Sequence, residues 1–530
     1  MSLKEKLNSK TLTTIFIFFF SLFFNQYFGN RGIFPIDSFS HFDLGFRVLN
    51  GELPFKDYWV VSGPFVDFIQ AFIFLILGVN WQTYLLNASI LNGIFAVLTY
   101  KLFLEFKLDK KFSFFYTICL AILAYPSSGT PFVDHHSTYF SVISLYLLIF
   151  AIKTEKLSYW FFLPIFVGFA FLSKQVPATY VGFSIILLIV YDSIFNNGAK
   201  NFNIFFTLII STSIFFLLFF LFLYFNEISF QSFLDQYINY PREIGRDRFL
   251  RLNYDFKNAI LNFKFIHIVF ILLIFLNISK FLNNKKFYKT INFKIFLILL
   301  LLLLSLMQHQ ILTRNQIFIF FLIPLFCGFT HIELHNLNHK YKDYLIYFLI
   351  LVCLTATFKY HLRFNLEKKF HEFNNVNFNN SINGKILDKK FKSLNWITPG
   401  TKEKKEAIEE IKFLKEILEI LKADKEKKML FTNYSFFSVL SGESVNSITR
   451  WFPGDDSAFP VKGNKFYDTY RNFLLKQIKS KEIINIYLIS DVYENYLLDY
   501  LPLECLKKTK IHKHLSKFKI NDKCQDLYGN

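Results

Sequence analysis

Long apolar runs alternate with short polar connections over the first two-thirds of the chain. A helix needs about 20 apolar residues to cross roughly 30 Å of hydrocarbon. Runs that approach this length lie near residues 11–29, 82–104, 112–126, 138–152, 157–173, 177–195, 202–226, 260–279, 291–307, 315–333 and 342–358. The pattern predicts a polytopic α-helical membrane protein with about 11 transmembrane helices.

One further apolar stretch, from Phe65 to Gly78, is too short to cross and contains Asp67. Such a segment is typical of a helix at the membrane interface, so residues 30–81 are expected to form one outer loop with interfacial helices. The first run follows MSLKEKLNSK without a small-residue cleavage site, which predicts an uncleaved anchor and a cytoplasmic amino terminus. With eleven crossings, Lys and Arg exceed Asp and Glu on the inner side and balance them on the outer side, in agreement with the positive-inside rule.

The remaining residues, 359–530, contain no run of spanning length and many of the charges, and the predicted topology puts them outside. Residues 401–423 and 464–480 show helical spacing, whereas KKMLFTNYSFF and IINIYLIS indicate buried strands. We therefore expect a transmembrane domain over residues 1–358 and a soluble α/β domain over residues 359–530 on the outer, periplasmic face.

The composition agrees with this division. The mean hydropathy is +0.32, and 53% of the 530 residues are hydrophobic, which excludes an ordinary soluble enzyme. The formal net charge of +19 is divided between membrane region and tail, so it does not require a nucleic-acid partner. Five cysteines are too few for a disulfide scaffold, and none stands with His at zinc-ligand spacing; Cys505 and Cys524 are left as one pair that could form a bridge in an oxidising compartment.

The first outer loop contains four acids. Asp37 follows the apolar IFPI segment near the end of the first span, where partial burial would raise its pKa towards that of a general base. We expect the other three, Asp43, Glu52 and Asp57, to form a solvated surface.

The second outer loop, YPSSGTPFVDHHSTY, places Asp134, His135 and His136 between two spans. These side chains suit an acid/base group or a metal site, and the alternative is that Asp134 caps the following helix. Because adjacent His side chains point apart in most backbones, we do not expect both to bind one ion. The candidates for a divalent cation are Asp37, Asp134 and His135.

Basic residues on the outer side suggest an anion site. Lys174, in GFAFLSKQVPATY, is either a snorkelling anchor or a ligand for a lipid phosphate. The predicted topology also puts all seven arginines of the membrane region outside, namely Arg31, Arg47, Arg242, Arg246, Arg248, Arg251 and Arg314. Since Arg forms bidentate bonds with phosphate oxygens, we expect Arg242 and Arg314 to bind a ligand, whereas Arg248 and Arg251 fit a helix at the lipid headgroups.

The order and sidedness of these features resemble the glycosyltransferase C superfamily, especially the protein O-mannosyltransferases and the lipid A aminoarabinose transferase. The resemblance covers about residues 10 to 335. It rests on Asp37, on the run Gly51, Asp57, Tyr58, Gly63 and Pro64, on an interfacial helix ending in Leu77-Gly78, on Asp134, on Gly168 to Gln175, and on Arg314 before a span with Pro324.

This resemblance implies that a sugar moves from a polyprenyl phosphate carrier to an acceptor on the outer face of the membrane. It assigns Asp37 as the catalytic or acceptor-positioning acid, Asp134 as the second-loop acid, and Lys174 to a donor-phosphate position. Many relatives have Asp-Glu where this chain has Asp37-Ser38, so the acceptor stays open among lipid, glycan and protein.

The sequence thus predicts an inverting glycosyltransferase of a bacterial inner membrane. The alternatives are a flippase or transporter of a lipid-linked sugar, and a polymerase or ligase. A transporter should carry ionisable groups near the bilayer midplane and two similar halves, and neither feature is visible here. A polymerase or ligase should have its catalytic loop late in the membrane region, whereas the acids here lie early.

Overall fold

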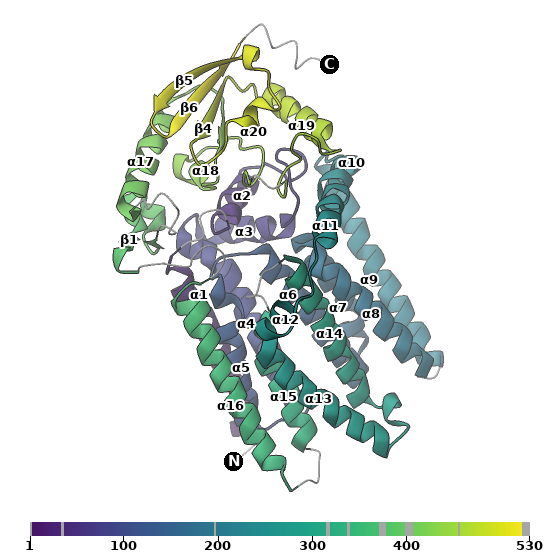
Figure 1. The fold of residues 1–530 in the computed structure, drawn as a ribbon. Coiled ribbons are helices and arrows are strands. Elements are labelled where there is room, and N and C mark those ends of the chain that lie inside the picture. Colours follow the sequence, from purple (N-terminus) through teal and green to yellow (C-terminus); the bar gives the residue numbers. More distant parts are fainter. Residues whose placement is uncertain are drawn as a thin grey trace. The chain divides into compact units, whose positions relative to one another are not determined.

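The computed structural model describes residues 3–32, 37–195, 198–313, 319–335, 340–369, 378–397, 406–453 and 456–521. The chain divides into two compact units, each built from separate stretches of sequence (Figure 1). The first unit contains Met1–Gly29, Leu85–Phe219 and Arg251–Asn374, and the second contains Asn30–Tyr84, Phe220–Leu250 and Asn375–Asn530. The second unit thus joins the predicted outer loop to the carboxyl-terminal tail.

The first unit is helical. Within the described residues, eight helices of the chain are long and apolar enough to cross a membrane, and the protein is an integral membrane protein. They are α1 (Leu3–Gly29), α4 (Trp81–Glu105), α6 (Val133–Thr154), α8 (Gln175–Phe195), α9 (Gly198–Phe225), α13 (Lys264–Asn283), α14 (Ile291–Thr313) and α16 (Lys342–Tyr360).

Three of the eleven predicted spans form shorter helices. They are α5 (Lys110–Leu123), α7 (Leu157–Ser173) and α15 (Leu322–His335), with 14, 17 and 14 residues. Helix α7 packs along α6, and α15 packs against α5 and α13. The short helices therefore belong to the bundle, and the total of eleven crossings stays a prediction.

Burial separates the inner helices of this unit from the outer ones. In α6, 78% of the apolar window is buried, whereas in α9 only 6% is buried. Helix α9 exposes large apolar side chains such as Phe202, Phe205 and Phe216. In a membrane these side chains would face lipid, because lipid tails accept apolar surface that water would not.

The second unit takes three helices from the loops, α2 (Ser40–Leu49), α3 (Pro64–Leu77) and α11 (Tyr240–Leu250). Helix α3 is 14 residues long, buries Asp67 and Gln70, and exposes Phe72 and Leu75. Its two faces, one with buried polar side chains and one with exposed apolar side chains, match those expected for an interfacial helix.

The tail contributes a four-stranded sheet in the order β3-β4-β6-β5. Strands β3 (Lys428–Phe431) and β4 (Asn485–Ile489) are parallel and fully buried, whereas β6 (Leu515–Ile520) pairs antiparallel with β4 and with β5 (Leu506–His512). Helix α19 (Tyr467–Ser480) lies in the crossover from β3 to β4. This connection resembles the β-α-β unit that parallel strands require.

Most of the tail elements follow the sequence pattern. Helices α17 (Ala407–Ala423) and α19 confirm the two predicted helices, except that residues 401–405 lie outside the described residues. The strand in KKMLFTNYSFF ends at Phe431, and the last residue of this segment is the first of α18 (Phe437–Ser441). The β5-β6 hairpin was not predicted. Cys505 is buried, but Cys524 lies outside the described residues, so their bridge stays a prediction.

Candidate active site

The second predicted loop of the membrane region leads into α6. A 3-10 turn at Tyr125–Ser127 and a proline-glycine segment separate α5 from α6, which begins at Val133. Asp134 lies in the first turn of α6, where the helix dipole favours an acidic side chain. The residue before the helix, Phe132, forms no side-chain cap.

Lys174 lies at the broken junction between α7 and α8. Its backbone is extended (φ −163°, ψ 139°), and its carbonyl accepts a hydrogen bond of 3.0 Å from Ser137 Oγ. Its Nζ donates to both carboxylate oxygens of Asp134, at 2.7 Å to Oδ1 and 2.8 Å to Oδ2. The side chain is 21% exposed and that of Asp134 is 7% exposed. The structure therefore brings these two predicted site residues together.

A third side chain joins them from a distant helix. His309, on α14, has its Nε2 at 2.7 Å from Asp134 Oδ1 and is 1% exposed. The sequence analysis missed this residue. An available signal was the polar run MQHQ in an otherwise apolar span, because ionisable residues inside spans usually face a partner or a cavity.

The two histidines after Asp134 take other partners. His136 contacts Tyr125 OH through Nδ1 at 2.5 Å and Asn87 Oδ1 through Nε2 at 2.9 Å. His135 contacts Ser127 Oγ at 3.3 Å, and both rings are buried. Among the described residues, no group of three or more His, Cys, Asp or Glu side chains is arranged to hold a metal ion.

The other predicted site residues lie in the second unit or outside the described residues. Asp37 is half-buried in a turn just before α2, and its carbonyl accepts a 3.3 Å bond from Ser40 Oγ. Arg242 is exposed on α11. Arg314 lies outside the described residues. Of the predicted site residues, the structure thus brings together Asp134 and Lys174, and it adds His309 to them.

The expectation that Asp43 and Glu52 form a solvated surface was wrong. Asp43 is 4% exposed, and Glu52 binds Arg47 through Nε (2.9 Å) and Nη2 (2.5 Å). Burial opposes the ionisation of Glu52, but Arg47 and Lys481 outweigh it and lower its pKa to about 2. Asp57 is half-buried and accepts a bond from the Leu53 backbone nitrogen at 2.8 Å.

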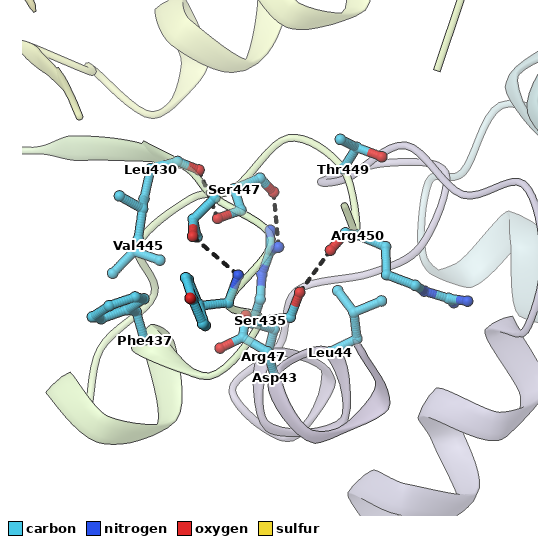
Figure 2. Close-up of a pocket in the computed structure, with 12 residues that line it drawn as sticks. Asp43, Leu44, Arg47, Leu430, Ser435, Phe437, Val445, Ser447, Thr449 and Arg450 are labelled. Atoms are coloured by element: carbon cyan, nitrogen blue, oxygen red, sulfur yellow. Dashed lines mark hydrogen bonds between the residues drawn. The ribbon is translucent and has the colours of Figure 1, made fainter. Parts of the chain in front are cut away.

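Arg47, one of the seven arginines predicted to lie outside, is not an exposed anion-binding residue. It is 1% exposed, and its Nη1 donates to the carbonyl of Ser447 at 2.8 Å. Arg47 and Asp43 line a small cavity where α2 meets the segments after β3 (Figure 2). Long-range contacts inside the protein explain this burial, and the sequence pattern contains no sign of them.

A second buried polar group lies beside α3. His41 Nδ1 is 2.5 Å from Asp67 Oδ1, and Arg450 Nη2 is 3.5 Å from Asp67 Oδ2. Burial raises the pKa of Asp67 to about 7, although Arg450 and Arg47 act in the opposite direction. Burial also holds the pKa of His41 well below its usual range, and the nearby Arg450 adds to this effect. His41 is therefore expected to be neutral near pH 7.

A helical membrane unit that gathers a carboxylate, an ammonium and an imidazole at one helix end is suited to binding a phosphorylated lipid. A family model described as dolichyl-phosphate-mannose-protein mannosyltransferase, within the glycosyltransferase C superfamily, matches residues 61–225. The match confirms the resemblance to this superfamily and includes Asp134 and Lys174, but it ends before His309. It indicates a membrane glycosyltransferase that uses a polyprenyl-phosphate sugar donor. A comparison with curated proteins found no match.

Proposed function

We propose that this protein is an inverting glycosyltransferase that moves a sugar from a polyprenyl phosphate to an acceptor hydroxyl on the outer face of a bacterial inner membrane. The observation that carries the proposal is the cluster of Asp134, Lys174 and His309, two of whose members lie in the segment that matches the family model. The acceptor is a lipid, a glycan or a protein.

Cleavage of the donor develops negative charge on the polyprenyl phosphate that leaves. Lys174 is proposed to stabilise this charge, because an ammonium group held in place before the reaction needs no reorganisation in the transition state. Asp134 holds the Lys174 ammonium through both carboxylate oxygens, and His309 contacts one of these oxygens, Oδ1. Arg242 and Arg314 stay candidates for further contacts with the phosphate.

The acceptor hydroxyl must lose its proton as it attacks the anomeric carbon. Asp37 is proposed as the general base, because its carboxylate follows the first span and is half-buried in a turn just before α2. Attack on the face opposite the leaving phosphate inverts the anomeric configuration. The proton goes to Asp37, the bond from the anomeric carbon to the phosphate oxygen breaks, and polyprenyl phosphate leaves as the anion.

The test uses the full-length protein in proteoliposomes with a panel of polyprenyl-phosphate hexoses and pentoses and a membrane extract as the source of acceptors. Wild-type protein should release polyprenyl phosphate and transfer the sugar. Asp37→Asn should lower the rate about 10² to 10⁴-fold, as loss of a general base does. Asp57→Asn, in the same loop, is the matched control and should keep the wild-type rate. Movement of intact donor across the bilayer without transfer would refute the proposal and favour a flippase.

A further inference from the structure

The residue two positions after Asp37 is enclosed by the tail. Phe39 is fully buried, and its ring centroid lies 4.9 Å from that of Phe436, 5.6 Å from that of Trp396 and 5.7 Å from that of Phe391. Such aromatic pairs contribute about 0.5–1.5 kcal/mol each beyond the burial of their area. The tail thus holds the backbone next to Asp37 through residues more than 350 positions away in sequence.

A second contact holds α2 four residues further on. The carboxylate of Asp43 accepts hydrogen bonds from the backbone nitrogen and from Oγ of Ser438, each at 3.0 Å. A buried carboxylate costs free energy unless donors satisfy it, so this geometry fixes α2 closely. Phe436 directly precedes α18, and Ser438 is the second residue of that helix. One short segment of the tail therefore contacts both Phe39 and Asp43.

Further hydrogen bonds hold the turn that contains Asp37 and the chain before it. The Ser40 hydroxyl donates to the Asp37 carbonyl, and Tyr84 OH donates to the Ser38 carbonyl at 2.7 Å. Before the turn, Gly32 donates its backbone N–H to the Asn395 carbonyl at 2.9 Å, next to Trp396 in the tail. The tail therefore contacts the chain on both sides of Asp37.

We propose that Phe436 and Ser438 are positioning residues for the candidate base Asp37, so that the tail is part of the catalytic apparatus without contacting substrate. This inference rests on the proposed function. Its physical reason is that reaction rates depend steeply on geometry, and a shift of about 1 Å in a reacting group can cost about 10²-fold. A tail serving only as an acceptor-binding domain would not need to enclose Phe39.

The experiment compares Phe436→Leu with Phe518→Leu in the proteoliposome assay. Both phenylalanines are fully buried in the tail, but Phe518 packs in the core of the sheet with residues such as Ile486, and Phe436 contacts Phe39. Phe436→Leu should lower kcat about tenfold and leave KM for the donor within about twofold, whereas Phe518→Leu should lower Tm without changing kcat per folded molecule. Ser438→Ala, which removes one hydroxyl, should give a smaller decrease in kcat.

Introducing Phe436→Leu into the Asp37→Asn variant distinguishes an effect on the position of Asp37 from a general loss of enzyme function. If Phe436 acts through Asp37, Phe436→Leu should lower kcat about tenfold in the wild type and leave the residual rate of Asp37→Asn unchanged. Equal decreases in both backgrounds, or an unchanged kcat in folded Phe436→Leu, would overturn the inference. If Phe436→Leu does not fold, Ser438→Ala in both backgrounds decides by the same criterion. Full activity of Asp37→Asn would refute the proposed base itself, which separates the two failures.

Discussion

The contact between Lys174 and Asp134 gives the sharpest test of the candidate active site. The perturbation is Lys174→Met, which keeps much of the length of the side chain and removes its charge. In this variant the Asp134 carboxylate, whose side chain is 7% exposed, loses its two hydrogen bonds from Lys174 Nζ. It keeps the bond from His309. Asp134→Asn makes the complementary change, because it leaves the ammonium opposite a neutral amide.

The size of the effect follows from the burial of the pair. Removing one partner of a buried ion pair costs about 3–5 kcal/mol, because the other charge stays buried without compensation. Lys174 is 21% exposed, and His309 still donates to Asp134, so we expect a cost of about 3 kcal/mol for each single variant. The double variant Asp134→Asn/Lys174→Met has no uncompensated charge, and it should be more stable than either single variant.

Two measurements on purified protein in detergent check this reasoning. Unfolding experiments compare the stabilities of the four proteins, and titration with polyprenyl phosphate measures the binding of the lipid phosphate. A hydrogen bond to a charged group contributes about 1.5–3 kcal/mol, so Lys174→Met should weaken binding about 10- to 100-fold. The double variant should regain stability but not binding. If the costs of the two changes add, or if binding recovers with stability, the proposed role of Lys174 is wrong.

Three further predictions concern other buried polar contacts. His309→Ala should lower kcat about tenfold because Asp134 loses one of its donors, and His309→Gln should retain more activity in the same transfer assay. Arg47→Lys should destabilise the protein by about 2 kcal/mol, measured by unfolding, since Lys cannot bond Glu52 and the Ser447 carbonyl together, and binding of polyprenyl phosphate should not change. The pKa of Asp67 is about 7, above its unfolded value of about 3.9, so the folded state takes up a proton and stability should fall as pH rises from about 4 to about 7. Asp67→Asn should flatten this dependence of Tm on pH, and an unchanged slope would contradict the assignment.

The positions of the long helices could be predicted because each span satisfies its backbone hydrogen bonds within itself, so an apolar run of sufficient length indicates it. The tail was predicted in part for the same reason, since α17 and α19 show helical spacing and β3 and β4 are continuous apolar runs. The β5-β6 hairpin carries exposed lysines along β5, which hides the alternation of apolar and polar residues that identifies a strand.

The site was predictable only where one segment contained its own signal. Asp134 and Lys174 stand out as charged residues at the ends of apolar runs, and the structure joins them. Ser438, the hydrogen-bond partner of Asp43, lies 395 positions away in the sequence. A local sequence pattern cannot predict a contact between such distant positions. His309 was missed because a single histidine in a helix is as consistent with a buried structural residue as with a functional one.

The segments that form the second unit constrain the membrane topology of the whole chain. Its three segments, Asn30–Tyr84, Phe220–Leu250 and Asn375–Asn530, form one compact unit, so they must lie on the same side of the membrane. The chain must then cross an even number of times between successive segments. Between the second and the third segment, the three long helices α13, α14 and α16 would give an odd number of crossings. Helix α15 is available to make this number even.

Between the first and the second segment, the four helices α4, α6, α8 and α9 already give an even number of crossings. The number stays even only if α5 and α7 both cross or neither crosses. Helix α7 has 17 residues, the lower limit for a span of about 17 to 25 residues. If α7 crosses, α5 crosses as well, and with α1 the total becomes the eleven that the hydropathy pattern predicts. In the predicted topology α1 crosses once before the second unit begins, so we expect the amino terminus and Asp37 on opposite sides of the membrane.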